Sequence, residues 1–289
     1  TFIWFYQGIG KVKLISSMTV ISRICILPLL FLFVKESTDY LKAIFIQSFV
    51  YLVTAIISCA YLYANKMIKL IVVSIKDIIK EIRESFPLFL SSASTTIYTR
   101  LFILILGVTA TPEAVGKYTA ADKIMRTLVT LFYTPLLQLY YPIVSRLSTI
   151  NMTRAFILFK KITKIALSFA LFITVILLCS GKFIYTFLGE GYVGITDLLM
   201  LFSIAPLFII TGGLAGQIGL LALGNNKCKL QYKRTYYKSA VLSLLILVPL
   251  SCFFAEKGVA LTVVITEILI SVQMIYYFHK YYISRKLIR

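Results

Sequence analysis

Long apolar runs recur along this chain, and short connections rich in Lys and Arg separate them. About 20 helical residues cross the hydrocarbon core of a bilayer, and a helix satisfies its own backbone polar groups in lipid. Hydrophobic residues make up 60% of the sequence and charged residues only 14%, an apolar share above that of soluble proteins. The sequence therefore predicts an all-α integral membrane protein.

We expect eight transmembrane helices. The predicted ranges are residues 14–34, 41–63, 86–107, 115–145, 162–180, 198–223, 239–255 and 259–278. The fourth is the longest and contains Pro135 and Pro142, which predicts a tilt or a kink. In the sixth, Gly212 and Gly216 stand four residues apart, a spacing that lets a partner backbone come close.

The connections between these runs alternate in charge. Five basic residues occur in each of 66–83, 146–164 and 227–238, and four follow His279, whereas the alternate connections carry five basic and five acidic residues in all. Because cytoplasmic loops are rich in Lys and Arg, the pattern predicts a multi-pass membrane protein with both ends of this chain cytoplasmic. The net charge of +19 lies in these short loops, so no nucleic-acid partner is expected.

Residues 66–84 place apolar side chains at helical spacing opposite charged ones. This pattern predicts an amphipathic helix on the cytoplasmic surface, and a solvated basic loop is the alternative interpretation. The segment divides the chain into residues 1–65 with two spans, the linker at 66–84, and residues 85–289 with six spans.

Ionisable residues inside the predicted spans are the strongest functional signal. A Lys or Arg at the bilayer centre costs at least about 2.5 kcal/mol, so such side chains face a protein interior or a wet cavity. At 1.5 Å per residue, all of them except Arg23 lie at a similar depth from the outer side. We predict that they form a substrate-binding site, whose candidate residues are Arg23, Arg100, Asp122, Lys123, Arg126 and Glu267.

Four cations against two carboxylates leave two positive charges in this predicted site. Arginine's planar fork suits phosphate oxygens, which favours an anionic substrate. On one face of the fourth span, Asp122, Lys123 and Arg126 align with hydroxyl-bearing residues, and a second row runs through the third span to Arg100. The alternative is mutual neutralisation, with Asp122 holding Arg126 and Glu267 holding Arg100 or Lys123.

No catalytic constellation, metal motif or cofactor loop is visible in the sequence. The five cysteines lack metal-type spacing, and His279 stands alone among tyrosines and a lysine. We therefore expect no enzyme activity, no metal and no cofactor.

Several ordered motifs resemble one family. Trp4-Phe-Tyr-Gln-Gly8 with Lys11-Val-Lys13 is similar to a WF-x-QG signature, and Ser85-Phe-Pro-Leu-Phe89 to an SFP start. The segment 116–124 is similar to GxYxAAxKI, Pro142 with Ser145 to P-x-x-S, and 187–192 to LG-x-x-Y. The chain thus resembles the polysaccharide lipid-carrier flippases, the Wzx-type O-antigen transporters of the MOP superfamily.

The resemblance implies a MATE/MOP-like bundle of twelve helices in two six-helix lobes, with a central cavity that opens alternately to each side. In relatives about four helices precede the WF-x-QG signature, so we expect an N-terminally truncated chain in which 85–289 is the C-terminal lobe. The implied substrate is an undecaprenyl-pyrophosphate-linked oligosaccharide, with Arg100, Lys123 and Arg126 on its diphosphate and Asp122 positioning Arg126. Implied partners are membrane lipids, an O-antigen polymerase and a chain-length regulator.

Two other functions fit parts of the sequence. A multidrug cation antiporter of the same fold should line its cavity with surplus acids, which this chain lacks. A non-transporting membrane scaffold for polysaccharide assembly would use the same basic loops and Gly-packed helices. The energy source stays open, because Asp122 and Glu267 could bind a coupling ion or form salt bridges.

Overall fold

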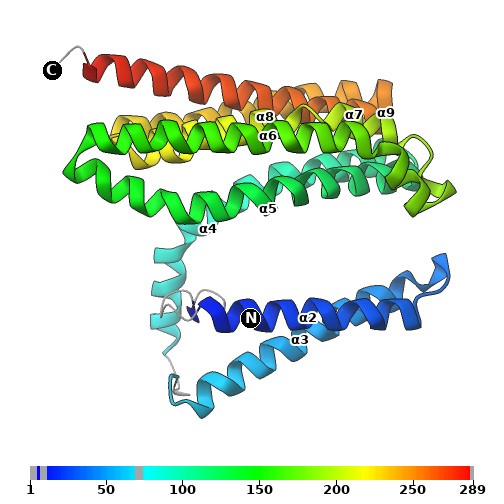
Figure 1. Ribbon diagram of the computed structural model, residues 1–289. Helices are drawn as coiled ribbons and strands as arrows, with labels where there is room; N and C mark the ends of the chain where they lie inside the picture. The colour runs from blue at the N-terminus through cyan, green and yellow to red at the C-terminus, as the bar shows by residue number, and fades with distance from the viewer. Residues whose placement is uncertain (1–4, 7–11, 69–73, 287–289) are drawn as a thin grey trace. The chain divides into compact units, whose positions relative to one another are not determined.

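The computed structural model describes residues 5–6, 12–68 and 74–286, with the backbone alone at residues 12–16, 19, 22–23, 37, 87–99, 182, 190 and 283–286. The regular structure within these ranges is helical, which confirms the all-α prediction. The main helices are α2 (Val12–Phe33), α3 (Tyr40–Ala64), α4 (Ile75–Thr109), α5 (Pro112–Ile150), α6 (Met152–Leu188), α7 (Ile195–Phe202), α8 (Ala205–Gly213) and α9 (Asn226–Lys286) (Figure 1).

Five helical stretches among the described residues are long and apolar enough to cross a membrane. They are Tyr40–Ala64, Pro112–Ile150, Met152–Gly181, Ile195–Ala222 and Asn226–Tyr282, and the last contains two of the predicted spans. Shorter apolar stretches, Ile24–Phe33 and Arg100–Thr109, lie in α2 and α4. A multi-pass membrane protein is therefore confirmed, while the number of eight spans stays a prediction.

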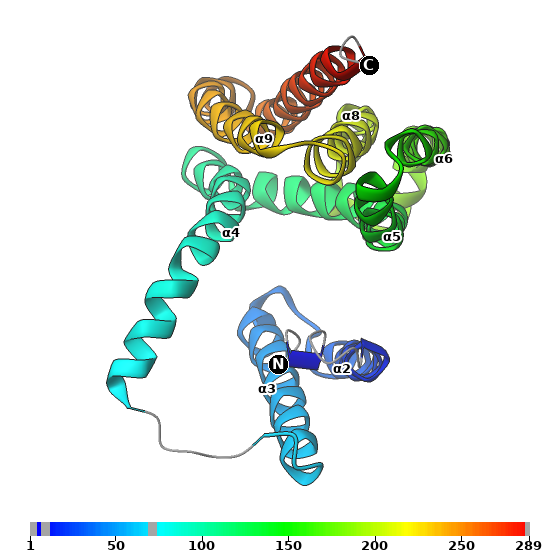
Figure 2. The same cartoon turned by 90° about the vertical axis from the view of Figure 1, so that its left-hand side faces the viewer.

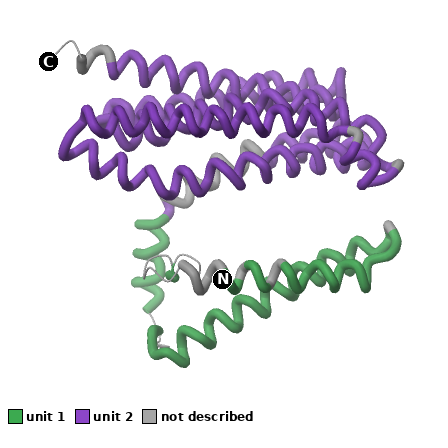
Figure 3. Tube along the Cα trace, viewed as in Figure 1, with its two compact units in different colours: residues 1–85 green, residues 86–289 purple. Residues whose placement is uncertain are grey.

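The chain divides into two compact units, residues 1–85 and residues 86–289 (Figure 3). In the first unit, α2 and α3 pack against each other. Tyr6 is fully buried beside Leu62 and donates its hydroxyl to the Ser58 carbonyl at 3.0 Å. This tyrosine is the variable position of the WF-x-QG motif, whose Trp4, Gln7 and Gly8 lie outside the described residues.

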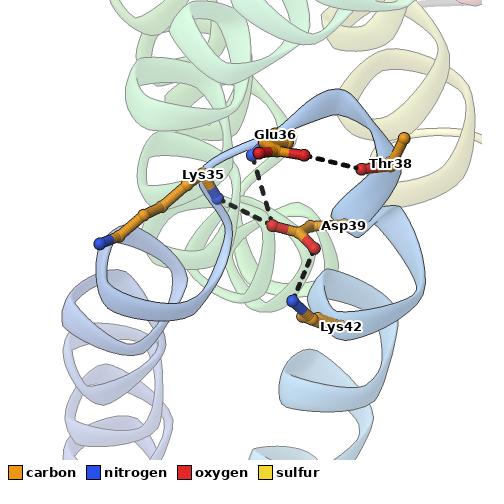
Figure 4. Close-up of polar contacts among 5 residues, drawn as sticks. All are labelled: Lys35, Glu36, Thr38, Asp39 and Lys42. Atoms are coloured by element: carbon orange, nitrogen blue, oxygen red, sulfur yellow. Dashed lines mark hydrogen bonds and ion pairs between the residues drawn. The ribbon is translucent and has the colours of Figure 1, made fainter.

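A short turn containing the 3-10 helix η1 (Ser37–Asp39) joins α2 to α3 (Figure 4). The Asp39 carboxylate accepts the backbone N–H groups of Lys35 and Glu36 at 3.2 and 3.3 Å, and it pairs with the Lys42 ammonium at 2.7 Å. The hydrogen bond from Lys42, with help from the two backbone donors, lowers the pKa of Asp39 below its ordinary value.

The predicted linker helix differs from the structure at its start. Residues 65–68 form a turn in which Lys66 has φ 53°, and residues 69–73 lie outside the described residues. The helix begins at Ile75 and continues without interruption to Thr109, so the later half of the predicted linker and the predicted third span form one helix, α4. The boundary between the two compact units falls within this helix.

In the second unit, α4 to α9 surround one apolar core that includes Leu106, Met125, Ile173, Phe202 and Val263. Helices α5 and α6 run in opposite directions, and so do the two halves of α9 (Figure 1), whereas Figure 2 views the bundle end-on. Helix α5 continues through Pro135 and Pro142 and follows a bent path in Figure 1, as its prolines predict.

The predicted sixth span is built from three pieces. Helix α7 ends at Phe202, α8 begins at Ala205 with Pro206 in its first turn, and a π-helical stretch, η3 (Leu214–Ala222), completes the span. A side chain at Gly212 would collide with the backbone of Ser271, so the close helix packing predicted at this glycine is confirmed.

Helix α9 reverses direction at Ala255, whose φ of 46° and ψ of −128° are not helical. The reversal separates the two last predicted spans one residue before the expected connection at 256–258. Gly258 lies directly against the Leu250 carbonyl, and a Cβ at this position would overlap that group. The tight reversal therefore requires glycine at position 258.

Candidate functional site

The site begins with a polar row on α5. The Thr111 hydroxyl caps this helix by accepting the Ala114 N–H, and Pro112 occupies its first turn. Helical spacing then directs Tyr118, Met125 and Val129 into the core. Asp122 and Arg126 are also four residues apart, but they are displaced by one residue from this buried row. They therefore lie at the border of the buried face.

Asp122 holds Arg126 through one nitrogen only. The Arg126 Nε donates to both carboxylate oxygens of Asp122, at 2.8 and 3.1 Å, which confirms the predicted pairing of these residues. Asp122 therefore fixes the position of the guanidinium. The two terminal NH₂ groups of Arg126, which can donate together to one anion, make no hydrogen bond among the described residues.

Glu267 approaches this pair from the second half of α9. Its carboxylate interacts electrostatically with both Arg126 and Asp122, yet no ion pair or hydrogen bond holds it among the described residues. Its side chain is half-buried. The structure thus pairs Asp122 with Arg126, and Glu267 is near enough to interact with both through their charges.

Two other predicted site residues, Lys123 and Arg100, form no ion pair with this cluster among the described residues. Both are exposed, and neither takes part in any other ion pair within the described part of the chain. Glu267 therefore holds neither of them, and the proposed neutralisation of these two cations does not occur there. The side chain of Arg23 and the hydroxyl row preceding Arg100 on α4 lie outside the described residues.

Two buried tyrosines of α5 were not among the predicted site residues, and one of them, Tyr118, interacts with the cluster. Tyr118 is buried against Phe202, with ring centroids 5.8 Å apart, and interacts electrostatically with Asp122 and Arg126. Tyr133 has a buried hydroxyl without a hydrogen-bond partner, and its ring lies so close to Gly213 that a Cβ there would overlap it. Tyr118 stands four residues before Asp122, a spacing that could have indicated it.

The described residues contain no group of three His, Cys, Asp or Glu side chains that could hold a metal ion. A cavity of about 310 Å³ is present in the second unit, but none of the six predicted site residues lines it.

Comparison with known protein families decides which class of protein carries this cluster. The family described as polysaccharide biosynthesis protein matches residues 1–148, just over half of the chain, including the polar row of α5. The chain belongs to this family. The resemblance inferred from the ordered motifs is thereby confirmed.

Two curated relatives are similar over almost the whole chain. A protein of Escherichia coli K12 named as a candidate O-antigen transporter is 30% identical over 274 residues, which cover 94% of this chain and 65% of the relative. A Shigella dysenteriae protein with the same name is 28% identical over 276 residues, covering 94% of this chain and 67% of the relative. The chain thus spans about two thirds of the length of the relatives it matches. No solved structure matches it.

Proposed function

We propose that this protein translocates an undecaprenyl-pyrophosphate-linked oligosaccharide, the O-antigen repeat unit, from the cytoplasmic to the periplasmic leaflet by alternating access. Family membership and the names of the two relatives support transport of this class of substrate. Transport breaks no covalent bond of the substrate, so no catalytic residue is needed. We place the protein in the bacterial inner membrane with both ends of this chain cytoplasmic, and an O-antigen polymerase and a chain-length regulator as its partners.

The availability of Arg126 is the observation that carries this proposal. Asp122 fixes the guanidinium through Nε, and both NH₂ groups have no hydrogen-bond partner among the described residues, which is the arrangement that bidentate phosphate recognition needs. The exposed cations Lys123 and Arg100, which form no ion pair among the described residues, would add to the attraction of the diphosphate. Arg23, whose side chain lies outside the described residues, stays a predicted substrate-binding residue.

The two carboxylates beside Arg126 have a role in the same proposal. A transporter must release what it binds, so affinity has to stay moderate. Asp122 and Glu267 reduce the positive potential at Arg126, which favours release of the lipid diphosphate after translocation.

A second function is favoured by the same cluster. Two carboxylates near one guanidinium would also attract a cationic substrate, as in a multidrug cation antiporter of the same fold. Two observations favour the anionic substrate instead: Asp122 accepts hydrogen bonds from Arg126 and fixes its guanidinium, and the relatives are named after transport of O-antigen.

The test is complementation of a bacterial strain lacking its O-antigen transporter by the intact gene that encodes this chain. We expect Arg126→Gln to abolish surface O-antigen. Arg126→Lys should reduce it strongly, because the single ammonium of lysine cannot bind Asp122 through one nitrogen and a phosphate through two others, as the guanidinium can. Arg146→Gln, an exposed residue on the same helix, is the matched control. Wild-type O-antigen from both Arg126 variants would refute the assignment of this site.

A further inference from the structure

An apolar cavity of about 310 Å³ lies at one end of the second unit, apart from the α5 cluster. Three segments meet there: the start of α6, the link from η3 to α9, and the end of α9 (Figure 1). The lining residues are Met152, Phe156, Gly219, Leu220, Leu223, Gly224, Asn225, Lys227, Cys228, Phe278, Tyr281 and Tyr282. The volume is at the lower end of the roughly 300–1,000 Å³ typical of ligand pockets.

Stacked aromatic rings make one wall of the cavity. The rings of Phe156 and Tyr282 are 3.9 Å apart between centroids and inclined by 7°, and Phe278 stacks on Phe156 at 6.1 Å. Leu220 and Cys228 also line the cavity and are buried. The interior therefore suits a hydrocarbon chain rather than a water-soluble group.

The polar groups of the cavity are few. The Asn225 side-chain oxygen already accepts the backbone N–H of Cys228 at 3.1 Å, which begins α9. Lys227 is exposed and has no ion pair among the described residues, so its ammonium is available at the rim. Lys227 is the charged side chain that lines the cavity.

The surroundings of the cavity are strongly basic. The segments 146–164, 227–238 and 279–282 contain eleven Lys and Arg residues and no Asp or Glu. The Lys160 ammonium lies 5.2 Å from the centre of the Phe156 ring, directly beside the aromatic wall. An apolar cavity at the end of membrane-crossing helices with a cationic rim is complementary to an amphiphile with a negative head.

We propose that this cavity binds an anionic phospholipid, with one acyl chain against the aromatic wall and Leu220, and the phosphate at Lys227. The basic segments mark the cytoplasmic side by their charge, which is where the head groups of anionic lipids in the inner leaflet lie. A bound lipid would join the start of α6 to both ends of α9. The proposal is independent of the substrate transported at the α5 cluster.

The test is native mass spectrometry of the purified full-length protein with phosphatidylglycerol and with phosphatidylcholine of the same acyl chains. We expect phosphatidylglycerol to be retained about fivefold more tightly, because one cation at the membrane surface strengthens the binding of an anionic lipid by about this factor. Lys227→Glu, at an exposed position that leaves the fold intact, should remove most of this preference. Cys228→Trp, which fills the cavity, should remove binding of both lipids.

Lys238→Glu is the matched control, because this lysine is exposed on α9 in the same basic segment and does not line the cavity. Equal retention of the two lipids, or equal loss of binding in Lys227→Glu and Lys238→Glu, would overturn the proposal, since attraction would then be absent or spread over the whole surface. Displacement of phosphatidylglycerol by an equimolar polyprenyl diphosphate would also overturn it, because the cavity would then belong to the transported substrate.

Discussion

At the scale of single residues, Arg126 shows how a partly buried ion pair can keep donors for a ligand. Most paired arginines direct their fork at the carboxylate, which consumes the donors that a ligand would need. Here Asp122 takes Nε alone, from four residues away on the same helix. The fork is then oriented by a neighbour whose position the helix itself fixes.

Glu267 supplies the sharpest residue-scale prediction. Because it interacts with Arg126 without holding it, Glu267→Gln should raise the local positive potential and leave the guanidinium in place. A soluble prenyl diphosphate should then bind about five- to tenfold more tightly, as expected for removing one nearby, partly screened charge. Isothermal titration of the purified protein would measure this change.

Glu256→Gln is the control for this measurement, since it makes the same substitution on the same helix outside the cluster. An unchanged or weaker affinity in Glu267→Gln would show that the diphosphate does not bind near Arg126. Weaker binding of an organic cation in the same variant would instead support the antiporter alternative.

At the scale of elements, the ends of the helices were less predictable than their existence. The apolar runs indicated where helices lie, because length and hydropathy are sufficient for that. Length and hydropathy do not indicate the division of the sixth span at Ser203 or the π-helical turns after Gly213. They depend on packing against α9, which a single sequence does not display.

The reversal at Ala255 leads to a stability prediction. Gly258→Ala should lower the free energy of unfolding by about 1–3 kcal/mol, because its Cβ would displace the Leu250 carbonyl. Gly107→Ala on α4 has open space around it and should be neutral or slightly stabilising. Thermal unfolding of both variants in detergent measures the difference, and equal melting temperatures would contradict the packing argument.

The turn between α2 and α3 should respond to acid. Because its pKa in the folded protein is lowered, the Asp39 carboxylate stabilises the turn above its ordinary pKa of 3.8, and this contribution disappears as the pH falls through the lowered value. Amide-exchange protection of Lys35 and Glu36 should fall over that range. Asp39→Asn should show the reduced protection already at neutral pH, and unchanged protection would mean that the carboxylate does not hold these amides.

At the scale of the whole molecule, the alternation of basic connections between the helices was more informative than the depth at which ionisable residues lie in the membrane. The basic connections gather at one end of the second unit, as alternation predicted (Figure 1). Depth placed Arg100, Lys123 and Arg126 at one level, but it says nothing about direction around a helix axis or about which side chains meet. Lys123 shares a level with Arg126 and is nevertheless exposed, whereas Glu267 meets Arg126 from a helix far away in sequence.

The predicted orientation can be measured with single cysteines introduced after the native ones are replaced. Asn151 is exposed between α5 and α6, in a connection with five basic residues, and Gly191 is exposed between α6 and α7, where one basic and one acidic residue balance. Because positive loops are retained in the cytoplasm, a membrane-impermeant thiol reagent added to cells with a permeabilised outer membrane should label Gly191→Cys and not Asn151→Cys. Disruption of the inner membrane should make both positions reactive, which shows that Asn151→Cys is accessible in itself. Labelling of Asn151→Cys in intact cells would reverse the orientation and place the basic end of the second unit, with its lipid cavity, on the periplasmic side.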